Sequence, residues 1–212
     1  MEKRLRDAMK KITIDPITTA ITVNQYVTGS YFKKYAPAAP IIADVDLYVT
    51  SVNMKVGAYT VATPSPSDGL CRNVTATVTT GGGVVDVSLG TLLITGTDYN
   101  SKVITETLTL VTGTVTGIKA FKTVTNVVGA GWVIDAAPAT EDTITVGCGN
   151  KIGMPEVVSK EQIVMTIWNQ AMSTTLPTFA YGQEISNCTV TLPAAGDSAK
   201  KLIVFYIKHL GT

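Results

Sequence analysis

The sequence is poor in the residues that most enzymes use to transfer protons. It has one histidine, His209, and no Gly-x-Ser-x-Gly motif. Histidine is the common general base near neutral pH, so a hydrolase triad is disfavoured, and His209 is expected at the exposed end of the last strand. Ser198 and Lys201 have Ser-x-x-Lys spacing, but the companion motifs of that enzyme class are missing, which favours a turn. We therefore expect no enzyme, no catalytic residue and no cofactor.

Cysteine is also scarce. The chain has three, Cys71, Cys148 and Cys188, far below the density of a disulfide scaffold. Cys148 and Cys188 lie in strand-like stretches, where a thiol packs as a small hydrophobic group. We expect all three to be unpaired, and their wide spacing without nearby histidine argues against a zinc site.

Two pairs of oxygen-bearing side chains are the remaining candidates for metal ligands. Asp44 and Asp46 share one face of an expected strand, and Asp98 and Asn100 share a loop. Neither pair is followed by the glycine and glutamate that complete a calcium-binding loop. Turn-forming and solvent-facing roles are favoured, and no metal-binding residue is predicted.

Charge and long apolar runs are both limited. Charged residues make up 16% of the chain and the net charge is +1, so no overall field attracts nucleic acid and no specific nucleic-acid partner is expected. No apolar run approaches the roughly 18 residues of a membrane helix, and the first residues are charged where a secretory signal needs an apolar segment. We expect synthesis in a cytoplasm, no membrane partner, and a charge-poor surface suited to burial against other subunits.

What the chain does have is a succession of short strand-like segments separated by glycine, asparagine and aspartate turns. This spacing is typical of an all-β sandwich. We predict an antiparallel β-sandwich or jelly-roll-like domain over residues 36–212, an N-terminal helical or extended arm over 1–35, and a sub-boundary near 63–69, where two prolines and an Asp-Gly pair fall. Short helical turns near Glu161 and Ala171 are an alternative that the sequence leaves undecided. Strands are expected at 72–79, 84–89, 91–96, 102–111, 118–128, 131–135 and 142–147, with a central, doubly apolar strand at 200–209.

The stretch 92–110, "LLITGTDYNSKVITETLTL", is predicted to be a hairpin. In its second strand Ile104, Leu108 and Leu110 share a core face with Glu106, while threonines occupy the other face. A buried Glu106 would need a partner or a raised pKa, as some catalytic acids have. The favoured alternative places it at an edge, where it discourages wrong strand pairing.

The first twelve residues, "MEKRLRDAMKKI", have the apolar spacing of an amphipathic helix. A helix this short is marginal alone in water, so we predict an assembly arm that orders on another surface. The alternative is a fixed helix that covers the core of its own β-domain. The candidate partner-binding residues are Lys3, Arg4, Leu5, Arg6, Met9, Lys10, Lys11 and Ile12.

Two glycine-rich stretches, "TTGGGVV" and "GCGNKIG", lack the pattern of a phosphate-binding loop. We interpret them as turns or tight packing sites.

The central segment contains three ordered stretches: "RNVTATVTTGGGVVDVSLGTLLITGTDYNSKVITETLTL", "GIKAFKTVTNVV" and "DTITVGCGNKIGMP". Together they resemble a recurrent module of tailed-bacteriophage virion structural proteins, over residues 60 to 155. The resemblance implies a non-enzymatic, β-rich part of the virion, with a capsid decoration protein as the most natural member of that group. Its partners would be the major capsid protein or other virion subunits, including copies of itself.

Two alternatives stay open. A neck, tail or baseplate component would share the module but assemble elsewhere in the particle. A receptor-binding or glycan-binding module would instead use aromatic side chains as a stacking platform, from "YFKKY" at 31–35 or from Tyr99 and Trp132.

Overall fold

The computed structural model describes residues 30–135, 141–169 and 177–209, and this part of the chain is built from antiparallel strands. The all-β prediction is confirmed. Two short 3-10 turns, η1 (Lys160–Gln162) and η2 (Ile185–Asn187), interrupt the strands, and the first is the helical turn anticipated near Glu161. The strands are β1 (Ser30–Tyr35), β2 (Asp44–Asn53), β3 (Gly57–Tyr59), β4 (Arg72–Thr79), β5 (Thr91–Thr97), β6 (Val103–Thr109), β7 (Gly113–Phe121), β8 (Thr123–Ala130), β9 (Thr143–Gly153), β10 (Ile163–Trp168), β11 (Thr178–Ala180), β12 (Thr189–Thr191) and β13 (Leu202–His209).

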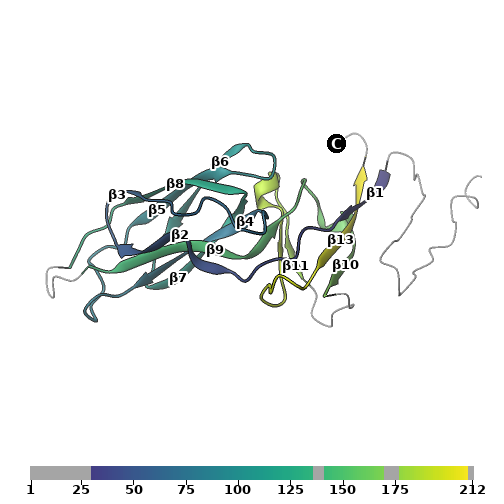
Figure 1. Ribbon diagram of the computed structural model, residues 1–212. Coiled ribbons are helices and arrows are strands. Elements are labelled where there is room, and N and C mark those ends of the chain that lie inside the picture. Colours follow the sequence, from purple (N-terminus) through teal and green to yellow (C-terminus); the bar gives the residue numbers. More distant parts are fainter. Residues whose placement is uncertain (1–29, 136–140, 170–176, 210–212) are drawn as a thin grey trace, which may run out of the picture.

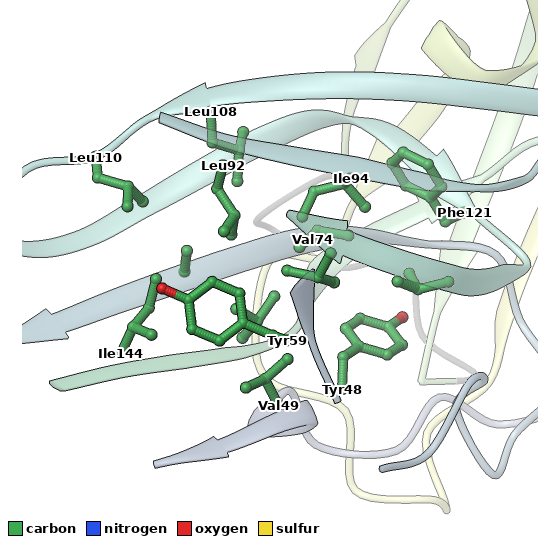
Figure 2. Packing of buried hydrophobic residues seen from close by; sticks show 14 of the residues in the cluster. Tyr48, Val49, Tyr59, Val74, Leu92, Ile94, Leu108, Leu110, Phe121 and Ile144 are labelled. Atoms are coloured by element: carbon green, nitrogen blue, oxygen red, sulfur yellow. The ribbon is translucent and has the colours of Figure 1, made fainter. Parts of the chain in front are cut away.

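Two sheets face each other in a sandwich (Figure 1). The four-stranded sheet has the order β3-β8-β5-β6, and the six-stranded sheet is centred on β9, with β4 and then β7 on one side and β2, β12 and β11 on the other. Alternate residues of each strand enter the space between the sheets, as Leu92, Ile94 and Leu108 do from one sheet and Val74 and Ile144 from the other (Figure 2). The pairing Leu92↔Leu108 fixes the register of the predicted hairpin.

A third sheet, with three strands in the order β1-β13-β10, lies beyond one end of the sandwich (Figure 1). Its strand β13 is central, as the doubly apolar pattern predicts. One face of β13, including Leu202, Val204 and Tyr206, packs with Met154 and Val190 in a hydrophobic cluster separate from that of the sandwich. Residues at the end of β9 and in β12 therefore connect the three-stranded sheet to the sandwich.

The expected strand at 118–128 is two strands that belong to opposite sheets. β7 ends at Phe121 and β8 begins at Thr123. The chain crosses the sandwich at Lys122, whose N–H donates to the Thr97 carbonyl at 2.7 Å. The sequence gives no turn signal at this corner, because only Lys122 lies between the two strands and no glycine, proline, asparagine or aspartate marks it.

The expected strands at 84–89 and 131–135 are wrong. These segments are loops that meet in one isolated bridge, Ser88↔Val133. Gly82 and Gly83 have positive φ, which turns the chain out of extended conformation before the first loop. The side chain of Asp86 then binds groups of other loops, so this residue cannot alternate as a strand residue would.

The predicted domain limits also need correction. Residues 30–35, assigned to an arm, form β1 and pair with residues 204–209 of β13, so the sheet begins at least five residues before position 35. The 63–69 segment crosses from β3 to β4, and residues on both sides of it, such as Tyr59 and Val74, enter the same core. No described residue forms a helix long and apolar enough to cross a membrane.

Candidate functional site: an uncharged face of the four-stranded sheet

The outer face of the four-stranded sheet carries no charged side chain in its described strands. Alternation sends Leu92, Ile94 and Leu108 into the core, so their neighbours point outward, and the cross-strand pairs place these neighbours side by side. This threonine face consists of Ala58, Thr91, Leu93, Thr95, Thr97, Val103, Thr105, Thr107, Thr109, Thr123, Thr125, Asn126, Val128 and Ala130.

Apolar groups and short hydroxyls dominate this threonine face. Leu93 is 41% exposed and Val103 is 68% exposed. The hydroxyls of Thr97 and Thr123 pair at 2.6 Å, and Thr125 donates to the Thr95 carbonyl at 3.2 Å. β-Branched side chains have few rotamers, so a partner that covers this face restricts little side-chain motion.

The outer face of the six-stranded sheet is also rich in threonine around β4 and β7. Thr77 and Thr114 share a hydroxyl hydrogen bond of 2.8 Å, and Thr116 lies opposite Thr75. Ile118, 61% exposed, is the large apolar residue that β7 adds to this face. Around β4 and β7 this face thus exposes one large apolar side chain, whereas the threonine face exposes two, Leu93 and Val103.

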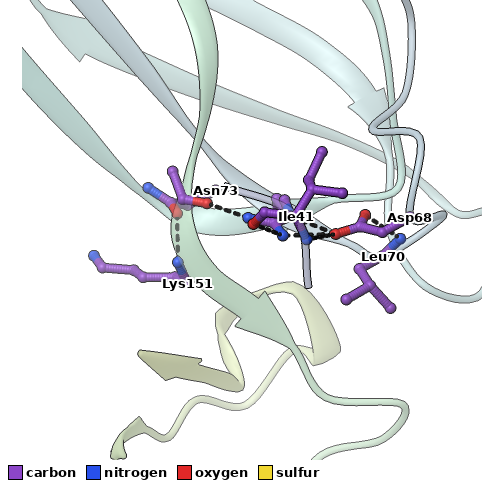
Figure 3. Close-up of polar contacts among 7 residues, drawn as sticks. Ile41, Asp68, Leu70, Asn73 and Lys151 are labelled. Atoms are coloured by element: carbon purple, nitrogen blue, oxygen red, sulfur yellow. Dashed lines mark hydrogen bonds and ion pairs between the residues drawn. The ribbon is translucent and has the colours of Figure 1, made fainter. Parts of the chain in front are cut away.

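Arg72 and Asn73, at the start of β4, have structural roles. The Arg72 side chain is fully buried and pairs with Asp68 at 2.6 Å. Its guanidinium also donates to the carbonyl oxygens of Gly149 at 3.0 Å and Ile41 at 2.8 Å, while Asp68 accepts the N–H groups of Ile41 and Leu70 (Figure 3). The buried charges are thus neutralised and hydrogen-bonded, and they tie the 63–69 segment to β4 and β9.

Asn73 and the glycines of β9 complete this joint. The Asn73 side-chain oxygen accepts the Lys151 N–H at 2.9 Å (Figure 3). A Cβ at Gly149 would lie 2.6 Å from the same Asn73 oxygen, and one at Gly147 would lie 1.9 Å from the Asp44 carbonyl oxygen. The "GCGNKIG" glycines are therefore tight packing sites inside a strand and not turns, which is one of the two interpretations drawn from the sequence.

Glu106 lies at the seam between the sheets. It projects from the edge strand β6, and its carboxylate accepts the N–H of Ile118 at 2.7 Å and, more weakly, that of Lys119 at 3.4 Å. Both N–H groups belong to β7, the edge strand of the other sheet. Glu106 thus binds N–H groups that an added strand would otherwise use, which agrees with its predicted role at a sheet edge. The partners of its carboxylate are backbone N–H groups and not a second acid.

Two buried aspartates, missed in the sequence, hold the loops at the far end of the sandwich. Asp142 accepts the N–H groups of Gly81 at 2.8 Å and Asp86 at 3.2 Å. Asp86 accepts the Trp132 indole N–H at 2.7 Å and the N–H groups of Asp135 and Asp142. Burial opposes ionisation of Asp86, but these hydrogen bonds outweigh it and lower its pKa. Both carboxylates therefore stabilise the loops through these hydrogen bonds.

The acidic pairs considered as metal ligands also have local roles. Asp98 accepts the N–H groups of Asn100 at 2.9 Å and Lys102 at 3.0 Å, which makes it the organiser of its own turn. Asp44 accepts the Asp46 N–H at 3.2 Å on β2. In the part of the chain that the structure describes, no three histidine, cysteine or acidic side chains gather as a metal site.

The remaining candidates for chemistry are separate from one another. Ser198 has a positive φ and donates its N–H to the Pro40 carbonyl at 2.9 Å, so it lies in a turn, as predicted. That turn borders an open groove of about 450 Å³, whose carboxylates are those of Asp44 and Asp197. Asp197 is occupied by the N–H groups of Ala199 and Lys200. His209 ends β13, opposite Ser30.

The three cysteines are unpaired and buried, as predicted. Cys148 lies in the sandwich core and Cys188 in the second cluster. Burial raises the pKa of Cys71 to about 12 and also raises that of Cys148, so both stay protonated near neutral pH. These thiols act as packing groups.

Tyr99, Trp132 and Tyr35, which the sequence offered as parts of a stacking platform, lie in separate places in the described structure. Trp132 is half-buried against the core and bound to Asp86. Tyr99 follows the Thr97 end of β5, whereas Trp132 lies beyond the Thr91 end, because Thr91 pairs with Ala130. Within the 31–35 segment, Tyr35 is buried and donates its hydroxyl to the Gly153 carbonyl at 3.2 Å.

A polar cluster around Glu156, also missed in the sequence, fastens the three-stranded sheet. Its carboxylate binds Lys33 at 2.6 Å, Lys208 at 2.5 Å and the Tyr206 hydroxyl at 2.5 Å. Partial burial would raise the pKa of Glu156, but the hydrogen bonds from Lys208, Lys33 and Tyr206 outweigh it and lower the pKa to about 2. The one sequence signal for this cluster is the alternation of side chains along β1 and β13, which puts Lys33 and Lys208 on the same face of the sheet.

The candidate partner-binding residues of the expected arm, Lys3 to Ile12, lie outside the described residues. Comparison with known proteins gives no assignment: no protein-family model, no curated protein and no solved structure matches this chain.

Proposed function

We propose that this protein is a non-enzymatic structural component of a bacteriophage particle, a decoration protein that binds the capsid shell through the threonine face. The observation that carries the proposal is the absence of any charged residue among the outward side chains of the described four-stranded sheet. A solvated sheet face normally carries charged residues for solubility, so a face without them fits burial against a partner.

The size of the threonine face decides how such binding would work. The sheet has three strands of seven or eight residues and one of three, and at a spacing of about 4.8 Å they cover roughly 400 Å². A stable pairwise interface buries about 800 Å² on each partner. One copy alone would therefore bind weakly unless adjacent loops contribute, whereas repetition at symmetry-related sites of a shell adds many such contacts.

The phage-like motifs have structural roles that agree with a packing module. Arg72, Asn73, Gly147 and Gly149 join the strands, and Asp98 shapes a turn. The polar side chains among them are hydrogen-bonded within the fold and are not free to bind a substrate. The resemblance and the geometry thus favour a scaffold whose outer surfaces carry the function.

Labelling of phage particles tests this proposal. Gold-conjugated antibody fragments against the chain, applied to virions of the phage that encodes it, are expected to decorate the head shell at many positions. Absence of the chain from the virions overturns the proposal.

A neck, tail or baseplate location is the second candidate, because the same module and the same uncharged face suit a ring or tube of subunits. Gold confined to the neck or tail would establish that candidate in place of the decoration role.

A further inference from the structure

The loops at one end of the sandwich expose a set of valines. Several loops meet there because the strand ends that they join are paired: Asn53 and Thr79 pair with Thr143, and Thr91 pairs with both Thr109 and Ala130. The described parts of these loops are residues 54–56, 80–90, 110–112 and 131–135. The valine end is the set of six valines in them that are 40% to 70% exposed: Val56, Val84, Val85, Val87, Val111 and Val133.

The loop at 84–87 has its polar and apolar side chains in the opposite places to a solvated loop. Asp86 is buried, and its carboxylate binds the Trp132 indole and two backbone N–H groups. Val85 and Val87, on either side of it, are exposed. Water favours hydrated carboxylates and buried valines. A cluster of exposed apolar side chains on a structured end indicates contact with another molecule.

The charges at the valine end are few and mostly engaged within it. The exposed Lys55 lies over the Tyr59 ring, with Nζ 5.4 Å from the ring centroid. The partly exposed Glu141 accepts a hydrogen bond from the Asn53 side chain, and Asp135 is the other partly exposed charge in the described loops. One cation and two acids give no basic surplus for nucleic acid or anionic lipid, so an apolar protein surface is the partner that fits.

The valine end is continuous with the threonine face. The Leu110 N–H donates to the Gly90 carbonyl at 3.0 Å, so the β5–β6 ladder extends beyond Thr109. Leu110 is buried and Val111 is exposed, so Val111 continues the series of outward side chains on β6.

The opposite end of the threonine face is charged. Lys102 pairs with Glu184 there, and Lys122 lies over the Tyr99 ring. An extension of the threonine face that stays largely uncharged therefore runs toward the valines.

The area of the threonine face calls for such an extension. Its roughly 400 Å² is about half of the 800 Å² that each partner buries in a stable interface. The exposed parts of the six valines equal about three complete valines, or roughly 300 Å² of apolar surface. The two surfaces together approach the area of a standard interface.

We propose that the valine end binds the same shell as the threonine face, so that the two surfaces form one apolar contact. This inference rests on the proposed function. The shell then presents an apolar surface to the loops as well as to the sheet. The buried Asp86 and Asp142 carboxylates hold the loops in place before binding, which lowers the entropy that binding costs.

Co-sedimentation of the full chain with shells of the encoding phage that lack it tests this contact. Val56→Ser with Val87→Ser removes apolar groups from two loops and is expected to reduce binding at least tenfold. Val157→Ser with Val164→Ser is the matched control, because these valines are 48% and 51% exposed but lie outside the valine end. The control should bind within about twofold of wild type.

Melting temperatures show whether lost binding is a folding defect. All four valines are exposed, so both variants should melt within about 2 °C of wild type. A second variant, Val111→Ser with Val133→Ser, changes the other two loops and should lose binding to the same extent. Wild-type binding should change less than about twofold between 50 mM and 500 mM salt, because few charges take part.

The outcomes separate this inference from the proposed function. Wild-type binding by both valine-end variants, with loss in Thr95→Lys with Thr107→Lys, overturns the inference and leaves the proposed function in place. Equal losses in the valine-end variants and the control, or a tenfold loss of wild-type binding in 500 mM salt, also overturn the inference. Failure of the wild-type chain to bind shells overturns both.

Discussion

At the scale of single residues, Arg72 joins parts of the chain that are distant in sequence. Its guanidinium binds Asp68, the Gly149 carbonyl 77 positions later and the Ile41 carbonyl 31 positions earlier. Because the Arg72 and Asp68 side chains are almost completely buried, the cost of removing one partner is dominated by the charge that is left behind.

Arg72→Met is therefore expected to lower the free energy of unfolding by about 3–5 kcal/mol, because the Asp68 carboxylate loses its counter-charge and two carbonyls lose a donor. Urea unfolding followed by circular dichroism measures this loss. Adding Asp68→Asn should recover part of it by removing the unpaired charge. A loss below about 1 kcal/mol for the single variant would show that this network does not hold the segments together.

Leu108 and Thr107 give a matched pair on the two sides of β6. Leu108 is 5% exposed in the core, and Thr107 belongs to the threonine face. Leu108→Asp should cost more than about 3 kcal/mol, because it buries a carboxylate without a partner, whereas Thr107→Asp should cost less than about 1 kcal/mol. Equal losses in urea unfolding would mean that both faces of β6 are buried within one chain.

Alternation in the sequence was sufficient to predict these two positions, because the side-chain period of a strand is local. It could not predict the Arg72 network, whose partners come together only when β4 and β9 pair. The hydrogen bond between Trp132 and Asp86 was missed for the same reason, since it joins loops 46 positions apart.

At the scale of elements, alternation predicted β4, β5 and β6, and a continuous apolar run predicted the central strand β13. The loop at 84–89 also contains alternating valines, so its sequence predicts a strand although it does not form one. The β7–β8 corner was missed because Lys122 alone separates the two strands, and it is not a residue type that signals a turn. Which sheet a strand joins depends on its distant partners and is not contained in its own pattern.

The attachment of the three-stranded sheet is expected to depend on pH through Glu156. Its pKa is about 2 in the folded chain, below the ordinary value of 4.5. Folding therefore favours the ionised form, so the stabilisation is complete above about pH 4.5 and is lost as the pH falls toward 2. Glu156→Gln should lower the melting temperature at pH 7 and reduce its further fall in acid.

Melting temperatures between pH 7 and 2.5 measure this effect, with Glu184→Gln as the control at a carboxylate whose side chain is 49% exposed. The control should follow the wild-type profile. A wild-type profile for Glu156→Gln as well would contradict the role assigned to the Glu156 cluster.

At the scale of the whole molecule, the distribution of charge is the most informative property. Only 16% of the residues are charged. Many of those that the structure describes are used internally, in Arg72–Asp68 and around Glu156, and the broad outer face of the four-stranded sheet has none. Composition indicated a surface suited to partners, but only the paired strands could locate it on one face.

The central claim is that the threonine face binds a capsid shell. Co-sedimentation of the purified protein with shells of the encoding phage that lack the chain measures this directly, by the number of copies bound per particle. Thr95→Lys with Thr107→Lys should reduce binding at least tenfold, because two cations would be desolvated without partners. Thr77→Lys with Thr116→Lys, on the outer face of the other sheet, should leave binding within about twofold of wild type. Wild-type binding by the Thr95 and Thr107 variant, with its fold intact, would contradict the account.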